Sequence, residues 1–91
     1  MKLVFLFTYC PPPHLYALKR WQIGIASTAE CPLVERVVDV EAYIGDKFVV
    51  VVGDRELAER LGVAYATEEE VEKFLAWLSR ELSPDLKPYL Q

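Results

Sequence analysis

Residues 48–52 form an uninterrupted apolar run, Phe-Val-Val-Val-Val, which constrains the fold more than any other feature of the sequence. Successive side chains of a β-strand point to opposite faces of its sheet, so a strand that is apolar throughout needs cover on both faces. The run is far shorter than the roughly 20 residues that a helix needs to cross a bilayer. We therefore predict a central strand in a sheet that is packed on both sides.

The residues before this run predict its pairing partner. Residues 37–44 largely alternate between apolar and polar side chains, which is typical of a strand with one buried face and one wetter face. A Gly-Asp pair at 45–46 separates the two segments, and glycine at the first central position suits a type II′ turn. We predict a β-hairpin over residues 37–54, in which Tyr43 faces Phe48.

Two further strands are expected from β-propensity. Residues 2–9 are strongly apolar and form a candidate interior strand, which the three prolines at 11–13 end. Residues 14–20 favour a short helix or an irregular lead-in to a strand over 21–26, with one long strand as the alternative. Residues 33–44 are predicted as a long strand that enters the hairpin.

Two helices are predicted after the hairpin. Asp54 is a candidate N-cap for a helix over residues 55–61, and Gly62 is its candidate C-terminal stop. The main helix opens at Thr67, where Glu70 three residues later completes a capping box. Its apolar stripe consists of Val71, Phe74, Leu75, Leu78 and Leu82. The helix is predicted to end at Ser83-Pro84, before a short tail over residues 85–91.

These elements predict a single α+β domain over residues 1–91. Its four-stranded, mainly antiparallel sheet carries both C-terminal helices on one face. A helix over residues 14–20 on the other face would instead give a thioredoxin-like three-layer arrangement. The 53% hydrophobic content is high for a short chain, which favours burial of one surface against a partner or a second copy.

Composition excludes several classes of function. The net charge of −4 and dispersed basic residues disfavour nucleic acid as a partner. With one histidine, His14, and scattered carboxylates, the sequence predicts no metal site and no cofactor. The chain has no asparagine and two glutamines, a depletion of thermolabile amides that is typical of thermophile proteins. The apolar run after Met1 is too short for a signal peptide, so we expect a cytoplasmic protein.

Cys10 and Cys31 are the two cysteines, and each lies beside a proline. Three interpretations stay open: a structural disulfide, which thermophile cytosols tolerate, a pair of free thiols, or a catalytic role for Cys10. A strand followed at once by a cysteine resembles the start of thioredoxin-like folds over about the first fifteen residues. Here Pro11, Pro12 and Pro13 stand where that family has its C-x-x-C motif, so the nearby resolving cysteine is absent.

Aromatic residues give the strongest indication of association. Tyr43 and Phe48 are expected on a sheet face that needs cover, while Trp21 and Trp77 are candidate interface anchors, because aromatic residues are over-represented at interfaces. No motif in the sequence identifies a reaction, which favours a non-enzymatic, self-associating or protein-interaction module, with a homodimer as the expected state. The alternative is a thiol-dependent, thioredoxin-like redox protein centred on Cys10.

Overall fold

The computed structural model describes residues 2–82, which form a five-stranded parallel sheet. The strands are β1 (Lys2–Phe7), β2 (Gly24–Ser27), β3 (Glu35–Arg36), β4 (Lys47–Val52) and β5 (Ala64–Ala66). They lie in the order β3-β2-β1-β4-β5, and every neighbouring pair is parallel. The predicted four-stranded, mainly antiparallel sheet is therefore wrong in both strand number and direction.

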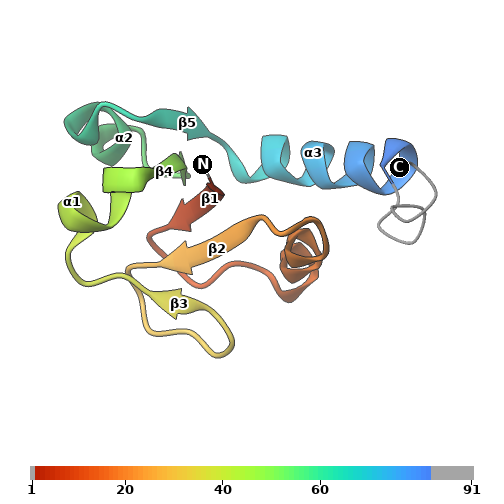
Figure 1. Ribbon diagram of the computed structural model, residues 1–91, viewed down its shortest axis with the longest axis horizontal. Helices are drawn as coiled ribbons and strands as arrows, with labels where there is room; N and C mark the ends of the chain where they lie inside the picture. Colours follow the sequence, from red (N-terminus) through yellow and green to blue (C-terminus); the bar gives the residue numbers. More distant parts are fainter. Residues whose placement is uncertain (1, 83–91) are drawn as a thin grey trace.

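Helices cover both faces of this sheet (Figure 1). They are η1 (Pro13–Trp21), α1 (Val40–Tyr43), η2 (Ile44–Asp46), α2 (Arg55–Leu61) and α3 (Glu68–Glu81), of which η1 and η2 are 3₁₀ helices. One face packs against η1 and α3, and the other packs against α1 and α2. The two C-terminal helices thus lie on opposite faces, not on one. Within residues 2–82, no helix has the length and apolar content needed to cross a membrane.

The thioredoxin-like alternative is wrong as well. Helices do lie on both faces, but all five strands are parallel, whereas a thioredoxin-like sheet is mixed. The helix that follows β1 is also a 3₁₀ helix that begins within the proline run.

The hairpin over residues 37–54 does not form, although the apolar run lies where we predicted. The interior position of β4, between β1 and β5, is confirmed. Residues 40–46, however, are helical, because the Asp39 carboxylate accepts a hydrogen bond from the Ala42 amide at 3.3 Å and caps α1. Strands that are apolar on both faces are characteristic of parallel sheets with helical crossovers, and β4 is connected in that way.

The segment after β1 becomes a helix. Residues 14–20 belong to η1, so the favoured helical interpretation is confirmed and the single long strand is wrong. Proline in the first turn of η1 is favourable, because its missing N–H group has no partner there in any case. The helix extends through Trp21 and stops at Gln22, whose φ of 63° is left-handed, which delays β2 to Gly24.

The predicted helix caps at the C-terminal end are confirmed. Asp54 accepts a hydrogen bond from the Leu57 amide at 3.0 Å, and Gly62 ends α2 with a φ of 69°. Thr67 and Glu70 form the reciprocal capping box of α3. The short strand β5 between these helices was not predicted. The predicted helix end at Ser83-Pro84 and the tail over residues 85–91 lie outside the described residues.

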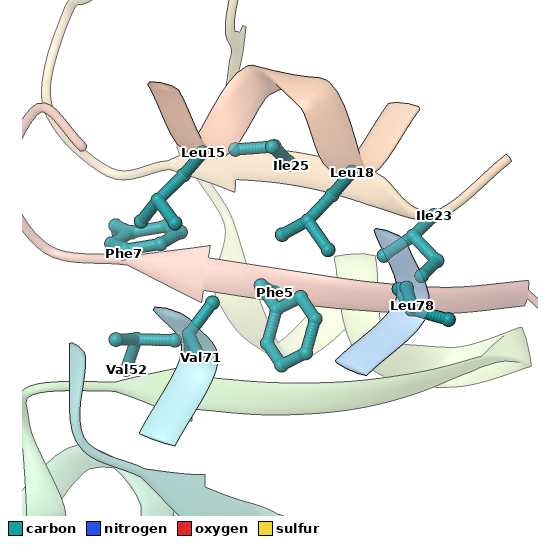
Figure 2. Close-up of a cluster of buried hydrophobic side chains, with 9 residues drawn as sticks. All are labelled: Phe5, Phe7, Leu15, Leu18, Ile23, Ile25, Val52, Val71 and Leu78. Carbon is teal, nitrogen blue, oxygen red and sulfur yellow. The ribbon is translucent and has the colours of Figure 1, made fainter. Parts of the chain in front are cut away.

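The core between the sheet, η1 and α3 is shown in Figure 2. Phe5 and Phe7 of β1 lie at its centre, with Leu15 and Leu18 of η1 above them. Its buried members are Phe5, Phe7, Leu15, Leu18, Ile23, Ile25, Val52, Val71 and Leu78. Of the predicted α3 stripe, Val71 and Leu78 are buried, Phe74 and Leu75 are partly buried, and Leu82 is 43% exposed.

Candidate interaction surface

An apolar groove lies between the first turns of α3 and strands β4 and β5. It has a volume of about 320 Å³, and among residues 2–82 Glu70 is the one charged residue that lines it. Its apolar walls include the side chains of Leu3, Phe48, Val50, Ala66 and Phe74. We call these residues the α3 groove. A concave, mostly apolar surface of this size is what proteins use to bind another apolar group.

Phe48 is the most exposed large apolar side chain among the residues that line the groove. Phe48 is 52% exposed, whereas its strand neighbour Val49, on the other face of the sheet, is 3% exposed. Phe48 lies beside Leu3 of β1 in the sheet register, but β5 begins only opposite Val50, so the start of β4 has no strand on its other side. Within residues 2–82, the Phe48 side chain at the start of β4 is therefore left half exposed.

An aromatic row extends from the groove along α3. The Phe74 ring meets Phe5 edge-on at a centroid distance of 5.9 Å and stacks on Trp77 at 6.2 Å with an interplanar angle of 17°. Trp77 is 43% exposed, so this row leads from the core to the surface. Phe74, which the sequence placed only in the helix core, thus lines the groove together with Phe48 and stacks on Trp77.

The other two predicted interface residues lie elsewhere. Trp21 is partly buried against the η1–α3 core, and its indole N–H donates to the Leu82 carbonyl. Tyr43 packs on the opposite face of the sheet, where its hydroxyl donates to Glu35 at 3.3 Å. The Lys47 ammonium lies 4.3 Å from the centre of the Tyr43 ring. The predicted pairing of Tyr43 with Phe48 across a hairpin is therefore wrong, because α1 carries Tyr43 to the other face.

The structure places Cys10 and Cys31 at disulfide distance. Their sulfur atoms are 2.11 Å apart and their Cα atoms 5.6 Å apart. Cys10 follows β1 and Cys31 lies in the loop between β2 and β3, so both are at the carboxyl edge of the sheet. Cys10 is exposed and Cys31 is partly buried. The partner of Cys10 is thus far away in sequence, not within a C-x-x-C motif.

The carboxyl edge between β1 and β4 is where parallel sheets of this strand order bind nucleotides. Here the Tyr9 ring fills that position, since a Cβ placed on Gly53 would lie 3.2 Å from its Cε1 atom. The Tyr9 hydroxyl donates to Glu68 at 2.6 Å, and burial together with Glu68 raises the pKa of Tyr9. Prolines 11–13 lack the amide donors that cradle phosphate, so these residues do not fit a dinucleotide.

His14 lies near this edge and approaches Glu72 of α3, with 3.5 Å between His14 Nε2 and Glu72 Oε2. Both side chains are about half exposed, so the contact is a surface one. Among residues 2–82, no cluster of three or more His, Cys, Asp or Glu side chains is placed to hold a metal ion.

No protein-family model, curated protein or solved structure matches this chain.

Proposed function

We propose that this protein is a non-enzymatic domain that self-associates as a homodimer through the α3 groove. The exposure of Phe48 carries this proposal, because a phenylalanine that stands open beside a preformed apolar groove gains free energy when a partner covers it. Exposed apolar patches of this kind mark interaction sites in soluble proteins.

The groove and the aromatic row next to it favour a second copy as the partner. A twofold interface pairs the same patch on both subunits, so each subunit needs a feature that projects and one that receives. Trp77 projects from α3, and the groove around Phe48 is open beside it. In a twofold dimer, Trp77 of each subunit would enter the groove of the other.

Charges on α3 are compatible with this arrangement. Glu70 lines the groove, and the nearby Glu69 and Lys73 pair at 3.3 Å along the exposed side of the helix. When two α3 helices pack antiparallel about a twofold axis, Lys73 of one subunit approaches the acidic first turn of the other. Such rim pairs set the register of an interface more than its affinity.

Sedimentation velocity over a concentration series tests the dimer. We expect a monomer–dimer equilibrium that Phe48→Ser and Trp77→Ser each shift toward monomer by at least tenfold in the dissociation constant. Val38→Ser is the matched control, because Val38 is 84% exposed and lies outside the groove. A dissociation constant of about 1 mM corresponds to a weak complex. A wild-type protein that is still monomeric at that concentration would therefore contradict the proposal. So would an equal loss of dimer in the Val38→Ser control.

A second candidate function, thiol–disulfide exchange at Cys10, is favoured by the position of the exposed Cys10 beside Cys31. In this reaction the thiolate of an external dithiol attacks the Cys10 sulfur and releases the Cys31 thiolate. The second thiol of the reagent then displaces Cys10, which leaves two protein thiols and an oxidised reagent.

Equilibration with glutathione buffers separates exchange from a structural role. A bridge that is half reduced near about −220 mV, the range of glutaredoxins, supports exchange, whereas one that stays oxidised below about −300 mV is structural. Alkylation followed by intact-mass measurement counts the thiols at each potential. Two labels are expected after full reduction, and their absence before reduction shows that the pair is bridged.

A further inference from the structure

We propose that a cleft at the amino edge of the sheet binds a small organic anion that carries an aromatic ring. The cleft has a volume of about 930 Å³ and lies at the starts of β1 and β2, beside the end of η1. Its walls include Lys2, Lys19, Trp21, Gly24 and Glu35, and we call these residues the amino-edge cleft. This site is separate from the α3 groove and does not rest on the proposed dimer.

Charge selects an anion. Two ammonium groups, those of Lys2 and Lys19, line the cleft against the single carboxylate of Glu35, although the whole chain carries a net charge of −4. Within residues 2–82, no carboxylate lies within 4.0 Å of either ammonium group. The Lys19 ammonium donates to the Leu33 carbonyl at 2.6 Å, which fixes its position and leaves two further N–H donors. The cleft therefore offers one excess positive charge to a ligand.

A close approach at Gly24 shapes the cleft. A Cβ at this position would lie 2.9 Å from Val4 Cγ2 and 3.2 Å from Lys2 Cε. Gly24 has no positive φ, so close packing and not backbone conformation explains the glycine. Its missing side chain lets the aliphatic part of Lys2 lie across the first residue of β2. Lys2 is exposed, so its ammonium group lines the cleft while it stays accessible to a ligand.

Trp21 provides an apolar wall. Its ring is partly buried against the η1–α3 core, and its indole N–H donates to the Leu82 carbonyl, so the ring orientation is set before a ligand arrives. Leu3 adds further apolar surface to the same cleft. A planar ring and two ammonium groups that line one cleft suit a ligand with an aromatic body and an anionic end.

Titration with 2-naphthoate, followed by ¹⁵N–¹H NMR, tests the site. The two indole N–H signals report on different surfaces, because Trp21 lines the cleft and Trp77 lies beside the groove. Trp21→Phe and Trp77→Phe assign them. We expect saturable shifts at Trp21 and Gly24, with Trp77 unchanged. The uncharged 2-naphthamide is expected to bind at least fivefold more weakly.

Variants identify the charged groups. Lys2→Met is expected to weaken 2-naphthoate binding about tenfold, and Gly24→Ala is expected to weaken it because it displaces the Lys2 stem. Lys73→Met is the matched control, since Lys73 is an exposed lysine on α3 outside the cleft. The proposal is overturned if 2-naphthamide binds as tightly as 2-naphthoate, if only Trp77 responds, if no signal shifts, or if Lys2→Met and Lys73→Met have equal effects.

Discussion

Phe7 and Phe48 lie on the same face of one sheet, but Phe7 is completely buried and Phe48 is 52% exposed. Phe7 ends β1 beside Val52, under Leu15 of η1 and near Val71 of α3 (Figure 2). Phe48 lies at the opposite end of that face, beside Leu3. One end of the face is closed by two helices, and the other end is open.

The path of α3 explains this difference. The helix begins after β5, at the carboxyl edge, and runs toward the end of η1, where Leu78 joins Leu18 and Ile23 in the core (Figure 1). It therefore covers β1 and the end of β4 and leaves the start of β4 without cover. On this face of the sheet, an apolar strand residue is thus buried only where a helix passes over it.

Replacement of each phenylalanine by alanine measures the contrast directly. Phe7→Ala is expected to lower the free energy of unfolding by about 4 kcal/mol, because it leaves a cavity in a closed core. Phe48→Ala should cost less than about 1 kcal/mol, since little surface is buried there in the monomer. Urea unfolding of dilute protein measures both. Equal costs would show that Phe48 is also covered in solution.

Loss of the Cys10–Cys31 pair, at the carboxyl edge of the sheet, is expected to lower the stability of the folded protein. The double variant Cys10→Ser/Cys31→Ser should be less stable by about 3 kcal/mol, because a bridge across this loop of roughly 22 residues restricts the unfolded chain. The comparison is made with oxidised wild-type protein by urea unfolding. Reduced wild-type protein is the control and should match the double variant. A variant as stable as the oxidised protein would contradict a stabilising bridge.

The capping box stabilises the first turn of α3, the helix that covers the carboxyl ends of β1 and β4. The Thr67 hydroxyl accepts from the Glu70 amide at 3.1 Å, and the Glu70 carboxylate accepts from the Thr67 amide at 2.9 Å. Thr67→Ala should therefore lower the free energy of unfolding by about 1 kcal/mol. Ser79→Ala, at an exposed position within α3, serves as the control and should cause no loss. Thermal unfolding followed by circular dichroism measures both variants.

Unfolding at high pH tests the contribution of Tyr43, which packs on the sheet face opposite the groove. Burial and the neighbouring Glu35 raise the pKa of Tyr43 to about 12 from its ordinary value of 10.0. The folded state thus holds the hydroxyl proton of Tyr43 more tightly than the unfolded state does. The contribution of Tyr43 to the free energy of unfolding is therefore complete below pH 10 and declines as the pH rises toward 12. The stability difference between wild type and Tyr43→Phe should shrink over this range. A constant difference in urea unfolding free energy would contradict the role of Tyr43.

Local sequence signals predicted local structure well. The caps at Asp54, Gly62 and Thr67 are confirmed, because a capping side chain and the amide it serves lie within four residues of each other. The interior position of β4, between β1 and β5, is also confirmed, since a strand that is apolar on both faces needs helices over each face. Of the four aromatic residues predicted at an interface, Phe48 lines the groove and Trp77 stacks on Phe74 beside it, and their role in association stays a prediction.

The sequence by itself determined where α2 and α3 begin and that the apolar run at residues 48–52 belongs to a strand inside the sheet. Only the tertiary structure decided strand direction, the face on which each helix packs, and the pairing of Cys10 with Cys31. These features depend on contacts between residues far apart in the chain, such as Leu3 beside Phe48. The alternation over residues 37–44 suits a strand of either direction, and only the apolar run at residues 48–52 is characteristic of a parallel sheet, so the side-chain pattern alone left strand direction open.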